Sequence, residues 1–214
     1  MVVLLVALAL APGDARAHQP RIVGNDTQVR VSTPEVSRAF YAKLPGRPAR
    51  YEITQRRPFN LYAQITVPDV DNAERDFVLR ILRGRRQLAR LTTAPERWKQ
   101  FYEPFGGDHY LTGPTFDRNV SGGDYTVEVS SPDNRGTYVL AIGKKEQWSP
   151  GEAANALAVL PQIKHDYFGQ SEARAWFSRT IPVLLIAIVL IALAVLGVLR
   201  IVRHRRRAGD RDLC

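Results

Sequence analysis

Cysteine is nearly absent from this chain of 214 residues, and the single cysteine, Cys214, is the last residue. A domain built from the preceding residues cannot contain a disulfide, so its hydrophobic core must stabilise it unaided. Apolar residues make up 45% of the chain and charged residues 24%, which is typical of a globular protein with such a core. The chain has room for one domain of about 150 residues between its terminal segments.

Histidine is also scarce, with four in the chain. Of these, only His109 falls among the predicted strands, because His18 precedes them and His165 follows them. There is no Gly-x-Ser-x-Gly motif and no cysteine available as a nucleophile, so nucleophilic catalysis lacks its usual groups. Zinc would need three or four histidine or cysteine ligands at compatible spacing, and these are missing too. We therefore expect no enzyme, and a hydrolase based on Asp108 and His109 is the remaining catalytic alternative.

Charge is missing from a short segment at the N-terminus. Residues 2–11 form an apolar run that is too short to span a bilayer. Pro12-Gly13 and Ala15-Arg16-Ala17 follow, and the second of these is the small-x-small pattern that a signal peptidase needs. The sequence thus predicts a signal peptide over residues 1–17, although this segment has no lysine or arginine before its apolar run.

A second uncharged segment, IPVLLIAIVLIALAVLGVL, lies near the C-terminus at residues 181–199. As a helix it would be about 28 Å long, close to the hydrocarbon thickness of a bilayer. An arginine cluster follows it, and the positive-inside rule places such a cluster in the cytoplasm. We expect a transmembrane helix at 181–202 and a basic cytoplasmic tail at 203–214. The protein would cross the cytoplasmic (plasma) membrane once, with its N-terminal domain outside.

The formal net charge of +9 divides between this tail and the exported part. Residues 200–214 carry +4, and residues 18–179 carry the remaining +5. A basic domain would ordinarily raise nucleic acid as a partner. The predicted topology argues against nucleic acid, because it places these residues outside the cytoplasm. The lipid bilayer, met through the single helix, is the partner that the sequence does predict.

Residues 18–149 show short runs with the alternation of β-strands, separated by turn residues. In residues 124–130, Tyr125, Val127 and Val129 alternate with polar neighbours. Residues 77–82 and 87–91 are joined by Arg83-Gly84-Arg85-Arg86, which has the length of a hairpin turn. The pattern predicts an all-β fold, an antiparallel β-sandwich of about seven to nine strands.

The stretch from Gly122-Gly123-Asp124-Tyr125 through Gly136-Thr137-Tyr138-Val139-Leu140 to Gly143 resembles the closing strand pair of prepeptidase C-terminal domains. These are small, non-catalytic β-sandwiches of secreted prokaryotic proteins. The resemblance covers residues 122–143, and it implies a sandwich fold for the exported domain.

Residues 150–180 are expected to form a stalk between the sandwich and the membrane. Within this segment Gly151–Leu160 has the composition of a short helix that Pro161 would close. The remaining residues are too irregular for a coiled coil.

Acidic residues gather in the segment PDVDNAERD. Calcium needs only oxygen ligands, so this segment is a conceivable calcium site, although its spacing is not that of an EF-hand. Solvated acids in a turn are the alternative. No other cofactor is expected. The candidate calcium ligands are Asp69, Asp71, Glu74 and Asp76.

Aromatic side chains are concentrated in the segment WKQFYEPFGGDHY at residues 98–110. Aromatic rings beside charged groups could form a platform for a glycan or a protein ligand. Core aromatics next to a long loop would give the same pattern. The candidate ligand-binding residues are Trp98, Phe101, Tyr102, Phe105, Asp108, His109 and Tyr110.

Taken together, these features predict a non-catalytic, membrane-anchored β-sandwich that acts outside the cytoplasm as a binding, recognition or accessory module. The alternative is a structural subunit, or a component resembling a cargo receptor, of a larger membrane protein complex. In that case the stalk and the helix would make the partner contacts.

Overall fold

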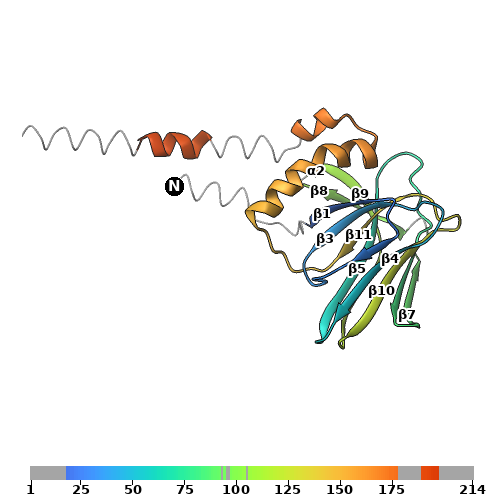
Figure 1. Cartoon of the computed structure of the whole chain (residues 1–214). Coiled ribbons are helices and arrows are strands. Elements are labelled where there is room, and N and C mark those ends of the chain that lie inside the picture. Colours follow the sequence, from blue (N-terminus) through green and yellow to red (C-terminus); the bar gives the residue numbers. More distant parts are fainter. Residues whose placement is uncertain (1–17, 93, 95–96, 105, 178–188, 198–214) are drawn as a thin grey trace, which may run out of the picture.

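Two β-sheets stacked face to face, and a helix on the outer face of one of them, make up the fold (Figure 1). The computed structural model describes residues 18–92, 94, 97–104, 106–177 and 189–197. Of the predicted segments, the signal peptide at 1–17 and the tail at 203–214 lie outside the described residues. The predicted β-sandwich is confirmed.

The larger sheet, sheet A, has six strands in the order β1-β3-β11-β5-β9-β8. Its strands are β1 (Gln19–Gly24), β3 (Arg38–Lys43), β11 (Thr137–Ile142), β5 (Phe59–Pro68), β9 (Asp108–Val120) and β8 (Lys99–Glu103). The smaller sheet, sheet B, has five strands in the order β2-β4-β10-β6-β7. Its strands are β2 (Gln28–Arg30), β4 (Ala49–Gln55), β10 (Gly123–Ser130), β6 (Val78–Arg83) and β7 (Arg86–Thr92).

The sandwich is not purely antiparallel as expected, because its first strands pair in parallel: β1 with β3, and β2 with β4. The chain leaves sheet A after β1, forms β2 in sheet B, and returns to sheet A as β3. Each time the chain returns to a sheet, the new strand runs in the same direction as the earlier strand of that sheet. The described residues contain eleven strands rather than seven to nine, since the short edge strands β1 and β2 lack clear alternation in sequence.

The space between the sheets is filled by the side chains that alternation places there. On β10, Tyr125, Val127 and Val129 are at most 2% exposed, as their period of two predicted. Tyr51 and Tyr138 are fully buried in the same layer, and their hydroxyl groups hydrogen-bond each other at 3.0 Å. Each of these buried phenols thus has a partner, which offsets the cost of removing it from water.

Sheet A is buried on its outer face as well. A second apolar cluster there joins side chains of β3, β9 and β11 to the helix α2 (Pro150–Phe168), which lies across this face (Figure 1). The members of this cluster are Ala39, Tyr41, Tyr110, Val139, Ile163, Tyr167 and Phe168. The helix is therefore packed on the sandwich rather than standing apart from it as a stalk.

The ends of α2 are set by local chemistry. Ser149 is the N-cap, and its hydroxyl accepts a hydrogen bond from the backbone N–H of Glu152. At the other end Gly169 has φ 62°, and its N–H donates to the carbonyl of His165. These are the usual start and stop signals of a helix.

The expectation that Pro161 closes this helix is wrong, because α2 continues through Pro161 to Phe168. Proline in a helix removes one backbone hydrogen bond and costs about 3 kcal/mol. Burial of Ile163, Tyr167 and Phe168 in the following turns offsets this cost. A short 3₁₀ helix, η2 (Glu172–Phe177), comes next.

Of the predicted transmembrane segment 181–202, only residues 189–197 are described, and they are helical. No helix within the described ranges is both long and apolar enough to cross a bilayer. The membrane span therefore stays a prediction.

Trp98 is a core residue and packs against a glycine of β9. Its indole is 8% exposed, and its Nε1–H donates to the carbonyl of Arg75 at 3.1 Å. A Cβ atom added to Gly113 would lie 2.7 Å from two carbon atoms of this ring. The absence of a side chain at Gly113 is therefore what lets the indole lie against the strand.

Gly113→Ala is expected to destabilise the protein by about 1–3 kcal/mol, the usual cost of overpacking a core. Chemical denaturation of the wild type and the variant measures this difference. Gly151→Ala is the control, because Gly151 lies in α2 with only Ser149 Oγ nearby at 3.8 Å. If the destabilisation by Gly113→Ala is unchanged in a Trp98→Leu background, the contact with the indole is not its cause.

Candidate functional site

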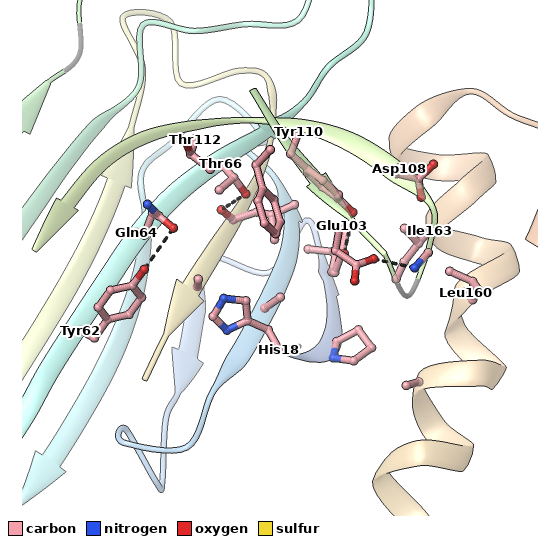
Figure 2. A pocket seen from close by; sticks show the side chains of 18 residues that line it. His18, Tyr62, Gln64, Thr66, Glu103, Asp108, Tyr110, Thr112, Leu160 and Ile163 are labelled. Atoms are coloured by element: carbon pink, nitrogen blue, oxygen red, sulfur yellow. Dashed lines mark hydrogen bonds between the residues drawn. The ribbon is translucent and has the colours of Figure 1, made fainter. Parts of the chain in front are cut away.

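A cavity of about 140 Å³ lies between the outer face of sheet A and helix α2 (Figure 2). Strands β3, β5, β9 and β11 form its floor, and Ala156, Leu160 and Ile163 of α2 form its roof. Most of the lining is apolar. Acidic groups enter beside the turn between β8 and β9, and other polar side chains, among them His18, Gln64 and Thr66, line the part of the cavity over β5 and the start of β1 (Figure 2). The structure thus places an apolar hollow with a polar end under the helix.

A buried ion pair stands at the polar end. The Nζ of Lys164 on α2 donates to Asp108 Oδ1 at 2.6 Å and to the carbonyl oxygen of Gly106 at 2.6 Å. The side chains of Lys164 and Asp108 are only 3% and 2% exposed. This pair fixes the helix to the β8–β9 hairpin, since both charges are stable in the interior only while they face each other.

The second carboxylate oxygen of Asp108, Oδ2, is buried and makes no hydrogen bond of normal geometry with the described residues, although the Gln170 amide is close enough to act on this carboxyl. Burial raises the pKa of the Asp108 carboxyl above its ordinary value, although Lys164 and Gln170 oppose that rise. The Glu103 carboxylate, which accepts a hydrogen bond from the N–H of Gly106 at 2.6 Å, borders the same space. A Cβ atom at Gly106 would lie 3.0 Å from both Asp108 Oδ2 and Glu103 Oε2. The cavity therefore has two acidic groups side by side at one end.

Two phenols continue the polar lining. The hydroxyl groups of Tyr41 and Tyr110 hydrogen-bond each other at 2.8 Å, and the Tyr167 hydroxyl donates to the carbonyl of Tyr41 at 2.8 Å. Burial, and then the charge of Glu103, raises the pKa of Tyr41, and burial raises the pKa of Tyr167 to about 12. These tyrosines are uncharged at neutral pH, so they contribute apolar rings and neutral hydroxyl groups.

The residues around this cavity have the chemistry to bind a small ligand. The apolar walls can take the body of a small ligand, and the acidic end can accept hydrogen bonds from it. Asp108 and His109 do not work together, because neighbouring strand residues face opposite sides: Asp108 is buried and His109 is exposed.

The structure places the predicted ligand-binding residues in different environments. Phe101, Asp108 and Tyr110 line the cavity. Tyr102 and His109 lie on the solvent side of the β8–β9 pair, with ring centroids 5.0 Å apart. The prediction of Trp98 as a surface platform is wrong, because this side chain is in the core between the sheets. Phe105 lies outside the described residues. The segment is mainly a hairpin, with one face under α2 and one in solvent.

The acidic residues proposed for calcium are spread along the segment between β5 and β6. Asp69 Oδ2 accepts a hydrogen bond from Gln100 Nε2 at 3.0 Å. A hydrogen bond that the protonated Glu74 carboxyl donates to Asp76 is the main reason that the pKa of Glu74 is raised, and Asp71 is exposed. Across the described part of the chain, no group of three or more His, Cys, Asp or Glu side chains is placed to hold a metal ion. The structure thus does not bring the four predicted ligands together.

Sequence reasoning missed the cavity because the residues that cover it, Ala156, Leu160 and Ile163, lie in the segment predicted as a stalk. One sequence signal was available. The runs Ala39–Ala42 and Tyr138–Ile142 are apolar on both strand faces, which indicates that sheet A is covered on each side. Lys164, by contrast, carried no signal that it would be buried, since lysine is mostly exposed in proteins.

Lys164→Met is expected to destabilise the protein by about 3–5 kcal/mol at pH 7, because it leaves the Asp108 carboxylate buried without its cation. The raised pKa of Asp108 sets the sign of the pH dependence. An acid with a raised pKa in the folded state stabilises the fold at low pH, and this contribution is lost as pH rises through that pKa. The loss of stability caused by Lys164→Met should therefore be smaller at pH 4 than at pH 7. Chemical denaturation of the wild type and the variant at each pH measures this loss.

The double variant Lys164→Met/Asp108→Leu tests the same pairing without a buried charge. It should be more stable at pH 7 than Lys164→Met alone. A double variant that is less stable than the single variant would mean that the two side chains contribute independently.

No protein-family model matches this sequence, and no curated protein matches it. The fold is similar to two solved structures. The pre-peptidase C-terminal domain of a collagenase from Bacillus anthracis is 14% identical over 58% of this chain and 95% of that domain, with a TM-score of 0.30. A β-glucosidase from Paenibacillus barengoltzii is 12% identical over 63% of this chain and 14% of the enzyme, with a TM-score of 0.25. At these TM-scores the two structures support no conclusion about this chain. The β-sandwich is established by the two sheets of the chain itself, and the resemblance of residues 122–143 to prepeptidase C-terminal domains stays a prediction.

Proposed function

We propose that this chain is a non-catalytic binding module, anchored in the cytoplasmic membrane, whose extracytoplasmic domain holds a small ligand in the cavity under α2. The observation that carries the proposal is the buried Oδ2 of Asp108, which accepts no hydrogen bond of normal geometry from the described residues, at the end of a mainly apolar cavity. A buried acceptor without a partner costs about 1–3 kcal/mol. A ligand that donates a hydrogen bond to it would remove that cost.

The size of the cavity limits the ligand. An engineered cavity of about 150 Å³ in another protein holds benzene, and the cavity here has about 140 Å³. The ligand, or the part of it that enters, is therefore about as large as one aromatic ring. Rings and aliphatic groups of Tyr41, Phe101 and Leu160 line the space around it.

The polar end limits the chemistry of the ligand. Glu103 and Asp108 present acceptor oxygens, and Lys164 is already paired with Asp108. A ligand with an ammonium or hydroxyl group can donate to these oxygens. An anionic ligand would meet two carboxylates in a partly apolar space, which is unfavourable.

The membrane part of the proposal rests on the sequence of residues 181–202. The described part of that segment is a helix whose Val189, Ile191 and Leu193 side chains are more than half exposed. Side chains of this type in such a position fit a lipid environment. The domain would then stand directly on the membrane, joined to it through η2.

Thermal unfolding of the full-length chain, purified in detergent, tests the proposal with three probes of equal ring size. Benzylamine and benzyl alcohol are expected to raise the melting temperature, and benzoate is not. A ligand at about 100 times its dissociation constant stabilises the folded state by about 2.7 kcal/mol. If none of the three probes changes the melting temperature, the weight moves to the alternative, a subunit of a membrane complex.

Two substitutions on the same helix provide a matched pair. Ala156 lines the cavity and is fully buried, whereas Ala153 is exposed. Ala156→Leu should fill the cavity and abolish the response to benzylamine, while Ala153→Leu should retain it. An undiminished response in Ala156→Leu would place the binding of the probe elsewhere.

A further inference from the structure

A groove runs along the side of the sandwich where the edge strands β1 and β2 lie. It has a volume of about 480 Å³, and Arg21, Arg30 and Arg38 are among its lining residues. A second hollow bordered by Arg47 and Arg50 adjoins it, since both are lined by Asp26 and Gln28. The two hollows form one surface, which we call the arginine groove.

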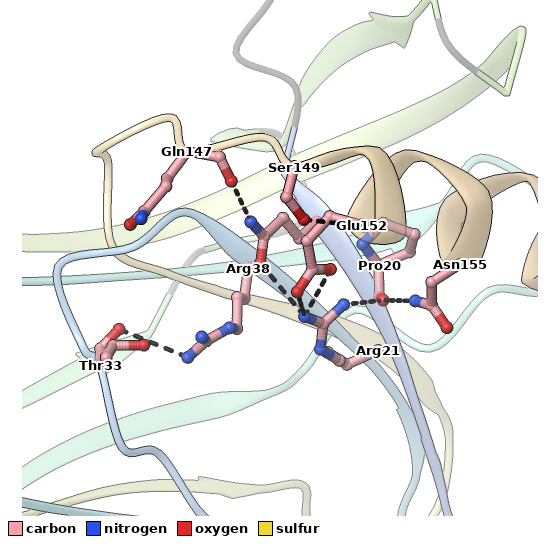
Figure 3. A network of polar contacts seen from close by, with 9 residues as sticks. Pro20, Arg21, Thr33, Arg38, Gln147, Ser149, Glu152 and Asn155 are labelled. Atoms are coloured by element: carbon pink, nitrogen blue, oxygen red, sulfur yellow. Dashed lines mark hydrogen bonds and ion pairs between the residues drawn. The ribbon is translucent and has the colours of Figure 1, made fainter.

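Two of these five arginines already have a carboxylate partner. Arg21 Nη2 contacts both oxygens of Glu152 at 2.7 Å, as Figure 3 shows. Arg50 Nε donates to Glu128 Oε2 at 2.9 Å. Arg30, Arg38 and Arg47 form no ion pair with a carboxylate of the described residues. Asp26, which lines both hollows, supplies one negative charge against these three. The arginine groove therefore carries an excess of positive charge that the protein itself does not balance.

The position of Arg38 is the most informative. Its Nη1 donates one long hydrogen bond, 3.4 Å, to the carbonyl of Thr33 (Figure 3). Burial and the nearby guanidinium of Arg21 lower the pKa of Arg38, while Glu152 partly opposes the effect. A half-buried guanidinium beside another guanidinium is stabilised by an added anion.

We propose that the arginine groove binds an anionic polysaccharide, with carboxylate or phosphate groups paired to Arg30, Arg38 and Arg47. Guanidinium groups bind such oxyanions through two parallel hydrogen bonds, which makes arginine better suited to this task than lysine. The charges are spread over β2, β3 and the segment before β4, so a chain with repeated anionic groups fits better than a single ion. This site is separate from the cavity under α2 and does not depend on the ligand proposed there.

Calorimetric titration of the full-length chain in detergent tests the proposal with four probes at low salt. Octameric galacturonate supplies carboxylates, and a phosphorylated mannan oligosaccharide supplies phosphates. Neutral dextran and a single-stranded DNA octamer are the comparison probes. Binding of either anionic sugar, without binding of dextran, is the expected result, and it should weaken at higher salt. The anionic sugar that binds more tightly identifies the anionic group.

The variant Arg30→Gln/Arg47→Gln should weaken binding of the anionic sugar by about tenfold or more. Its matched control is Arg85→Gln/Arg86→Gln, which removes the same charge from the exposed region of the β6–β7 turn. The control should bind within about twofold of the wild type. Arg38→Gln is a third variant, and thermal unfolding shows whether each protein is still folded.

Three results would overturn the proposal. One is that neither anionic sugar binds the wild type. Another is an equal loss of binding in the control, which would mean that net charge alone is responsible. The third is that DNA binds as tightly as the sugars and loses as much affinity in Arg30→Gln/Arg47→Gln, since the arginine groove would then recognise polyanions without preference for a polysaccharide.

Discussion

Sheet A can keep water from both of its faces only if something other than sheet B covers Ala39, Tyr41 and Val139. Helix α2 is that cover, and the fold at the C-terminal side of the sandwich follows from this requirement. The helix must run past Pro161 to reach far enough across the sheet. A straight helix cannot follow the twist of the sheet along its whole length, so part of the space between them stays unfilled. The cavity under α2 lies in that space.

The buried Lys164–Asp108 pair gives this apolar contact a defined geometry. Apolar packing alone tolerates sliding of a helix along a sheet, whereas a buried ion pair is stable in one position only. The pair leaves Asp108 Oδ2 without a hydrogen bond of normal geometry from the described residues, and the Glu103 carboxylate faces the same cavity. The Lys164–Asp108 pair therefore fixes the position of the helix, and Asp108 also makes one end of the cavity acidic. The arginine groove lies toward the C-terminal end of β1, where Arg30, Arg38 and Arg47 form no ion pair with the described residues.

Much of the sandwich could be predicted from sequence, because period-two alternation is local and survives in any context. Residues 124–130 and 137–142 form strands where the pattern placed them, and the turn at Arg83–Arg86 joins β6 and β7. The parallel pairing of β1 with β3 and of β2 with β4 could not be predicted, since strand direction depends on how the chain crosses between the sheets. Trp98 in the core and Lys164 in the interior depend on partners far along the chain. The C-terminal end of α2 also differs from the prediction, because burial of the turns after Pro161 offsets the cost of that proline and the helix ends at the Gly169 cap.

The late position of α2 in the chain has a consequence for folding during synthesis. Strands β1 to β11 are complete at residue 142, but the outer face of sheet A stays uncovered until residue 168 has followed. During that interval Tyr41, Tyr110 and Val139 are exposed on a formed sheet, and such surfaces promote aggregation. A chain that emerges from its N-terminus thus passes through a state with an apolar face that α2 covers only after all the strands of the sandwich have been made. The order of the elements along the chain therefore delays the covering of this face.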